Sequence, residues 1–169
     1  MGLEGEVMNI IECTIKMRKE AQANYANLSM AVADKDLKRL FSMLAAAEDE
    51  HIDNLLGINK ELNASAAVDD TRLSDSVCAY RPRMNARNVG KELRHDPDAY
   101  LHVVKDEEET IEFFDRLAAE ADREVTRKVC LAAADKEREH LQVIQNIYSF
   151  VEEPRTYLEC GEFSTNRSL

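Results

Sequence analysis

The chain lacks several features that characterise other classes of protein. Its 169 residues include no Trp, only five Gly and three Pro, and its four cysteines never form a C-x-x-C pair. Without such a pair, neither a zinc ribbon nor an iron–sulfur knuckle is supported. No apolar run approaches the length needed to cross a membrane. We therefore expect one compact, mostly helical domain, in which the cysteines at 13, 78, 130 and 160 are reduced thiols.

Positive charge is also scarce. The chain has 22 Lys and Arg residues against 33 Asp and Glu residues, which gives a formal net charge of −11. Nucleic acids and anionic membrane surfaces require clustered Lys and Arg, so neither is expected as a partner. Residues 1–12 are acidic and periodic, without the basic stretch and apolar core of a secretory signal, so we expect a cytoplasmic protein.

What the chain does contain is one set of potential metal ligands that occurs twice. Each set is a glutamate, a second glutamate 28 residues later, and a histidine three residues after that. The two sets are Glu20, Glu48 and His51, and then Glu109, Glu137 and His140. A glutamate three residues before a histidine places both side chains on one helix face, about one turn apart. The short spacing also occurs at Glu92 and His95, so the longer duplicated pattern carries the prediction.

The apolar pattern around these residues predicts two similar helical hairpins. Each Glu-x-x-His motif takes the place of core residues in an apolar stripe with spacings of three and four, and the two stripes are 89 residues apart. If the chain reverses at Asp34 and Arg123, midway between the paired glutamates, each hairpin carries its two glutamates at the same level. Two such hairpins facing one another would enclose four carboxylates and two imidazoles.

Buried carboxylates favour a metal at this place. An isolated ionised carboxylate inside a bundle costs several kcal/mol, so four that converge need protons or cations. Two divalent ions would cancel the four charges. Oxygen-rich ligation with one imidazole per metal favours two iron ions, with Mn or Zn as replacements. Carboxyl groups that stay protonated in pairs, or a splayed and wet bundle, are the structural alternatives.

The same arrangement, a Glu from each of two helices and Glu-x-x-His from the other two, is found in ferritin-like di-iron carboxylate bundles. The segments MRKEAQANYANLS, EDEHIDNL, EEETIEFFDRLAAEA and DKEREHL make residues 5–150 resemble the di-iron domain of rubrerythrins. The resemblance implies an all-α, ferritin-like antiparallel four-helix bundle. It also implies that Glu48 and Glu137 bridge the metals and that each histidine caps one metal.

The resemblance further implies an extra glutamate one turn after the ligand of the third helix, which here is Glu112. A surface position for Glu112 is the alternative, and the neighbouring acids Glu107 and Glu108 leave the register of this helix less certain. Tyr25 is either a residue beside the reactive centre or a core tyrosine with a satisfied hydroxyl.

The function implied by the resemblance is reduction of hydrogen peroxide, or of dioxygen, at a carboxylate-bridged di-iron site in oxidative-stress defence. Rubrerythrins proper also carry a rubredoxin domain with four cysteines, which this chain lacks. We therefore expect a separate electron-donor protein of the rubredoxin or flavoprotein reductase type, and a homodimer or small homo-oligomer. A ferroxidase or iron-handling ferritin-like protein is one alternative, and a non-catalytic helical interaction module is another.

The expected organisation is a single ferritin-like domain over residues 1–169. It consists of a hairpin at 5–62, a crossover at 63–97, a hairpin at 98–151 and a tail at 152–169. The crossover is long because the second and third helices run parallel, so the chain must return along the bundle. We expect a short helix near residues 86–94, and Pro154 after the end of the fourth helix. The sequence leaves open whether the hairpins are exchanged between subunits.

Overall fold

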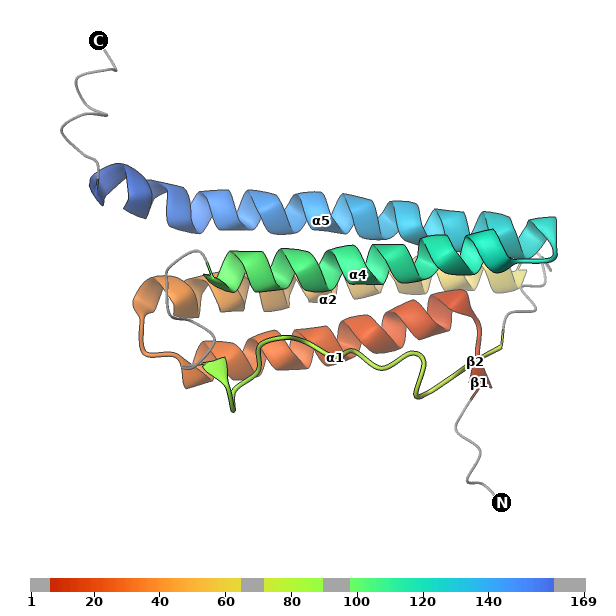
Figure 1. Ribbon diagram of the computed structural model, residues 1–169, viewed down its shortest axis with the longest axis horizontal. Helices are drawn as coiled ribbons and strands as arrows, with labels where there is room; N and C mark the ends of the chain where they lie inside the picture. The colour runs from red at the N-terminus through yellow and green to blue at the C-terminus, as the bar shows by residue number, and fades with distance from the viewer. Residues whose placement is uncertain (1–6, 65–71, 90–97, 160–169) are drawn as a thin grey trace, which may run out of the picture.

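The computed structural model describes residues 7–64, 72–89 and 98–159, and it is a bundle of long helices (Figure 1). The helices are α1 (Ile10–Ala31), α2 (Lys35–Ala64), α4 (Asp98–Glu120) and α5 (Glu124–Glu159). Two short strands, β1 (Val7–Met8) and β2 (Leu73–Ser74), pair antiparallel and join the start of the described chain to the crossover. The predicted fold class, an all-α ferritin-like four-helix bundle, is confirmed. No helix in the described ranges is long and apolar enough to span a membrane.

Local capping decides where the first two helices begin. Asn9 accepts a hydrogen bond from the Glu12 backbone N–H, and the Glu12 carboxylate accepts one from the Asn9 N–H, which together form a capping box. Asp34 accepts from the backbone N–H groups of Asp36 and Leu37. A carboxylate in this position satisfies the free donors of a helix start. Asp34 therefore caps α2 and does not form the centre of the turn.

The two hairpin turns decide which residues of the paired helices lie level with one another. Residues 32–34 separate α1 from α2, and residues 121–123 separate α4 from α5. The reversals are therefore centred on residues 33 and 122, one residue before the positions expected from the sequence. A shift of one residue at the turn changes the pairing by two residues.

The core consists of two apolar clusters with a polar layer between them. One cluster combines the first half of α1 with Phe114, Cys130 and neighbouring residues, and the other combines Tyr25 and Leu28 with Phe41, Val103 and their neighbours. Each helix passes from one cluster to the other. At the crossing it carries buried polar or charged side chains, and these form the layer described below.

The crossover lies along α1. The Cys78 carbonyl accepts from Lys16 Nζ at 3.4 Å, and the Met84 carbonyl accepts from Asn24 Nδ2 at 2.9 Å. A disulfide between Cys13 and Cys78, both fully buried, links the two segments. The prediction that these two cysteines are reduced thiols is therefore wrong, because the fold brings together residues that are 65 positions apart.

Other expectations have mixed outcomes. Cys130 is buried and is not part of the disulfide, in agreement with a reduced thiol, and Cys160 lies outside the described residues. The expected helix at 86–94 lies partly outside the described residues, and residues 86–88 form a turn.

The expectation that the fourth helix stops before Pro154 is wrong, because α5 continues to Glu159. A proline removes one backbone donor from a helix and bends it, but the turns on either side of it remain helical here.

Candidate functional site

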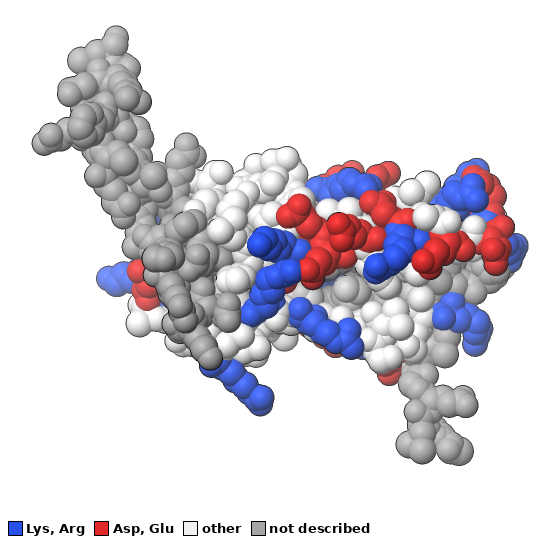
Figure 2. Space-filling view, viewed as in Figure 1, with Lys and Arg blue, Asp and Glu red and all other residues white. Residues whose placement is uncertain are grey.

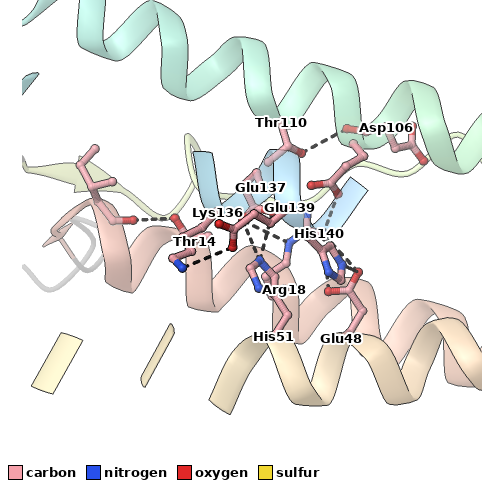
Figure 3. Close-up of polar contacts among 12 residues, drawn as sticks. Thr14, Arg18, Glu48, His51, Asp106, Thr110, Lys136, Glu137, Glu139 and His140 are labelled. Carbon is pink, nitrogen blue, oxygen red and sulfur yellow. Dashed lines mark hydrogen bonds and ion pairs between the residues drawn. The ribbon is translucent and has the colours of Figure 1, made fainter. Parts of the chain in front are cut away.

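Six buried side chains converge in the polar layer, and each helix contributes at least one (Figure 3). They are Arg18 from α1, Glu48 and His51 from α2, Glu107 from α4, and Glu137 and His140 from α5. Each residue from the first hairpin has its counterpart 89 positions later. None of the six is more than 7% exposed. The layer therefore follows the internal duplication, except that an arginine in one half corresponds to a glutamate in the other.

The two Glu-x-x-His motifs contact each other across the bundle. His51 Nε2 lies 3.2 Å from both carboxylate oxygens of Glu137, and His140 Nε2 lies 2.9 Å from Glu48 Oε1. The two imidazole rings stack, with centroids 4.2 Å apart and planes 9° from parallel. This reciprocal arrangement follows from the antiparallel course of α2 and α5, which places each histidine opposite the glutamate of the other motif.

Arg18 projects from α1 into the middle of the layer (Figure 3). Its Nη1 donates to Glu48 Oε1 at 3.1 Å and to Glu107 Oε2 at 2.8 Å. Its Nε lies 4.0 Å from Glu137 Oε1, and its guanidinium carbon lies 5.9 Å from the centre of the Tyr80 ring. A permanent cation therefore lies among all three carboxylates of the layer.

Burial and Arg18 together determine the protonation of the layer. Burial raises the pKa of Glu107 to about 8, although Arg18 opposes the shift. Burial also acts to raise the pKa of Glu48, but Arg18 and His140 outweigh it and the pKa is lowered. Burial, and then Arg18, lower the pKa of His51 to about 4, so this imidazole is neutral at pH 7. The guanidinium and the Glu107 proton thus compensate much of the buried negative charge without a metal.

The structure brings together four of the six residues predicted as core ligands, namely Glu48, His51, Glu137 and His140. Metal binding by these four residues remains a prediction. They meet because the Glu-x-x-His spacing is local to one helix and does not depend on the position of the turn.

Glu20 and Glu109 lie outside the layer, so the expectation that they complete it is wrong. Glu20 is 40% exposed; it accepts from Lys16 Nζ and from the Tyr80 backbone N–H at 2.9 Å. Glu109 is 59% exposed and pairs with Arg83 of the crossover. Two residues correspond to a rotation of about 200° around a helix, so the changed register turns both carboxylates away from the core. In their place, the residues level with Glu48 and Glu137 are Arg18 and Glu107.

The two residues predicted to act in catalysis also lie apart from the layer. Glu112 is exposed on α4. Tyr25 is buried in the second apolar cluster, where its hydroxyl accepts from the Tyr80 hydroxyl at 3.5 Å. Burial, and then Tyr80, raise the Tyr25 pKa well above its ordinary value. Of the two interpretations considered for Tyr25, the geometry favours the core tyrosine.

The sequence also contains a signal for Arg18 and Glu107. They are 89 residues apart, the same offset that relates the two Glu-x-x-His motifs. Arg18 is also in helical phase with the buried residues Ala21, Tyr25 and Leu28, at spacings of three and four. An offset of 89 also joins Glu20 to Glu109, however, so the offset alone does not distinguish the two pairs.

Two clefts flank the layer. One of about 440 Å³ opens between α2 and α5 above His51 and His140, with Glu50, Lys136 and Glu139 at its edge. The other, of about 220 Å³, lies beside the crossover and is lined by Tyr80 and Thr110 among others. On the face shown in Figure 2, charged side chains gather over α4 and α5 toward their shared turn, with basic and acidic groups interspersed. Arg138 of α5 pairs with both Asp115 of α4 and Asp135.

A sequence model of the family described as Rubrerythrin matches residues 9–148, which include all six residues of the layer. The chain belongs to the rubrerythrin family. No curated protein and no solved structure matches it. Membership of the rubrerythrin family supports a di-iron carboxylate protein in general and suggests that iron is the metal.

The donor set does not fit the two metal ions that the rubrerythrin family implies. A ferritin-like di-iron site takes a glutamate from each of two helices and Glu-x-x-His from the other two. Here Arg18 stands where one of those glutamates would be, and its Nη1 is bonded to two of the three remaining carboxylates. Arginine stays protonated in proteins, so it repels a divalent ion at this place. Among the described residues, no group of three or more His, Cys, Asp or Glu side chains is arranged to hold a metal ion.

Proposed function

We propose that this protein is a rubrerythrin-family bundle whose centre works without a di-iron pair, and that it serves as a non-catalytic helical interaction module. The observation that carries the proposal is the position of Arg18, which lies among Glu48, Glu107 and Glu137 with 1% of its side chain exposed. In this proposal the guanidinium takes over the role of counter-charge that metal ions have in di-iron bundles.

The charge balance supports the part of the proposal that concerns a centre without metal. Ionised carboxylates buried without compensation would cost several kcal/mol each, which is the reason that a four-glutamate cage needs metal. With one carboxylate replaced by Arg18 and with Glu107 protonated below a pKa of about 8, that need is largely removed. The duplicated Glu-x-x-His motifs then have a structural role, since each histidine pairs with a buried glutamate of the opposite helix.

Peroxide reduction and ferrous oxidation are the two competing functions. Both require iron to be held between the hairpins, and both would require Arg18 to leave the carboxylates that it contacts. Under the present proposal the separate electron-donor protein expected from the sequence is not needed. Iron binding therefore decides between the proposal and its competitors.

The test is an anaerobic ferrous titration of the metal-stripped protein, with iron counted per chain after desalting. We expect the wild-type protein to retain no tightly bound iron and to leave the rate of peroxide consumption unchanged. Arg18→Glu restores the fourth carboxylate and should gain up to about two irons per chain, the number held by ferritin-like di-metal sites.

Lys19→Glu is the matched control, because it makes the same charge change at the neighbouring, exposed position of α1. It should leave iron binding as in the wild-type protein. The proposal would be wrong if the wild-type protein kept about two irons per chain and lost them on replacement of Glu48 or His140. This wild-type measurement remains decisive even if Arg18→Glu does not fold.

A further inference from the structure

We propose that the disulfide between Cys13 and Cys78 is a redox switch that holds the first part of the crossover against the bundle. We call this part, residues 72–80, the strap. A dithiol reductant opens the bond, and the strap then leaves the side of the bundle between α1 and α4, along which the crossover runs (Figure 1). The inference goes beyond the proposed function and does not depend on whether the polar layer binds iron.

The disulfide is the main attachment of the strap to α1. Cys78 is the only buried side chain within residues 72–80, and it is fully buried. The polar contacts with α1 lie closer to the surface, where Lys16 Nζ donates to the Cys78 carbonyl at 3.4 Å. Glu20, which is 40% exposed, accepts from the Tyr80 backbone N–H. Hydrogen bonds near solvent hold a segment weakly, because water replaces them at little cost. Once the disulfide is open, the strap therefore depends on these contacts, on the short β1–β2 pair and on the half-buried Tyr80 ring.

The second part of the crossover, residues 83–89, is attached in a different way. Met84 and Val89 are 2% and 7% exposed and belong to the second apolar cluster. Arg83 pairs with the Asp106 carboxylate of α4 at 2.6 Å. None of these contacts involves a cysteine, so opening the disulfide leaves them in place. The release of the strap should therefore end before Arg83.

The strap covers the arginine of the polar layer. The Tyr80 ring lies over the Arg18 guanidinium, with 5.9 Å between the ring centre and the guanidinium carbon. On the other side of the strap, toward α4, lies the cleft of about 220 Å³, which is lined by Val77, Tyr80, Asp106 and Phe113 among others. Because of this cleft the strap is not closely packed against α4, and it has room to move. Opening the disulfide would therefore give solvent and ligands access to Arg18.

The surroundings of the bond favour exchange with a dithiol. Both cysteines are buried, but Cys78 ends a turn in which Ser76 and Val77 are exposed, so a local opening of that turn brings its sulfur to solvent. A thiolate of the reductant attacks the Cys78 sulfur, and Cys13 leaves as a thiolate. The first turn of α1 and the ammonium group of Lys16, one turn further along, both favour negative charge at Cys13. The second thiol of the reductant then displaces Cys78 from the mixed disulfide. Two electrons and two protons pass from the dithiol to the protein, which gives two protein thiols and the disulfide of the reductant.

The test is amide hydrogen exchange, followed by NMR on the full-length, metal-free, 15N-labelled protein before and after treatment with dithiothreitol in the absence of denaturant. The crossover provides two matched reporters. The Tyr80 N–H donates to Glu20 at 2.9 Å, and the Arg83 N–H donates to Asp106 at 3.2 Å. We expect reduction to raise the exchange rate of the Tyr80 N–H by about tenfold or more, and to leave that of the Arg83 N–H within about twofold. Reoxidation should restore the slow exchange of Tyr80.

Two cysteine variants are the controls. Cys13→Ala removes the bond, so Tyr80 should exchange fast with and without reductant, whereas Cys130→Ala should respond to reductant as the wild-type protein does. The proposal would be overturned if the disulfide were reduced only in denaturant, which would make it a purely structural link. Equal changes at Tyr80 and Arg83 on reduction, or no change at Tyr80, would also overturn it. The reduced wild-type protein carries these outcomes even if Cys13→Ala does not fold.

Discussion

Glu107 and Glu109 lie two residues apart on α4, and their surroundings differ in every respect that matters for chemistry. Glu107 is 3% exposed and contacts Arg18, whereas Glu109 is 59% exposed and pairs with Arg83. The burial of Glu107 raises its pKa to about 8, in contrast to the ordinary value of 4.5 for a glutamate. A carboxyl group of this kind makes folding stability depend on pH.

We predict that the free energy of unfolding falls by about 1–2 kcal/mol between pH 6.5 and pH 8 because of Glu107. In this range the unfolded chain has already released the Glu107 proton, while the folded chain still holds it, so rising pH favours unfolding. His51 acts in the opposite direction and at lower pH. Its pKa is about 4 in the folded state, below the ordinary value of 6.5, so His51 makes the free energy of unfolding rise between pH 4 and pH 6.5. Above pH 6.5 this effect of His51 is constant.

Urea unfolding at pH 6.5 and pH 8 measures the Glu107 effect. Glu107→Gln should flatten the dependence in this window, since the amide does not titrate. Glu108→Gln, at the exposed neighbouring position, should leave it unchanged. A Glu107→Gln variant with the wild-type slope would show that another group is responsible.

At the scale of the elements, the crossover is held at several points along α1 and α4. Glu20 on α1 accepts from the backbone of Tyr80, and Glu109 on α4 pairs with Arg83. The two glutamates expected to bind metal therefore fasten the crossover from both sides. The disulfide between Cys13 and Cys78 adds a covalent link at the start of α1.

We predict that removal of this disulfide lowers the free energy of unfolding by about 2–4 kcal/mol, because it releases a closed loop of the unfolded chain. The double replacement Cys13→Ala and Cys78→Ser should show this loss in urea, and reductant should then have no further effect. Cys130→Ala should keep the sensitivity to reductant, because Cys130 is not part of the disulfide. Denatured wild-type protein should titrate two fewer thiols before reduction than after it, and an equal count would contradict the disulfide.

At the scale of the whole molecule, the expected assembly is a dimer or small oligomer. Several large apolar side chains remain exposed on the single chain, among them Leu101 at 50% and Phe150 at 57%. Exposed apolar side chains mark a subunit interface only where they form a contiguous patch, so the assembly has to be measured.

We predict that sedimentation equilibrium gives about twice the 19.2 kDa chain mass, in agreement with a homodimer. Metal-stripped and iron-treated protein should give the same mass, because the proposed function does not involve iron. A shell of a dozen or more subunits would instead favour the iron-storage alternative.

The sequence alone was sufficient to predict the long helices, the duplication and the convergence of the two Glu-x-x-His motifs in the core. These features depend on helical periodicity and on residues three or four apart, which lie on one helix face in any context. Glu48, His51, Glu137 and His140 could therefore be identified from the sequence as a group facing the core.

Only the tertiary structure decided which residues of α1 and α4 face that group. The choice between Arg18 and Glu20 depends on one residue at the turn, because Asp34 caps α2 and moves the reversal to residue 33. Local propensities do not define a turn to that accuracy. The disulfide also required the fold, since residues 65 positions apart meet only after the crossover has packed along α1. The change of register, about 200° around each helix, thus places Arg18 of α1 and Glu107 of α4 at the centre of the bundle, where Glu20 and Glu109 were expected.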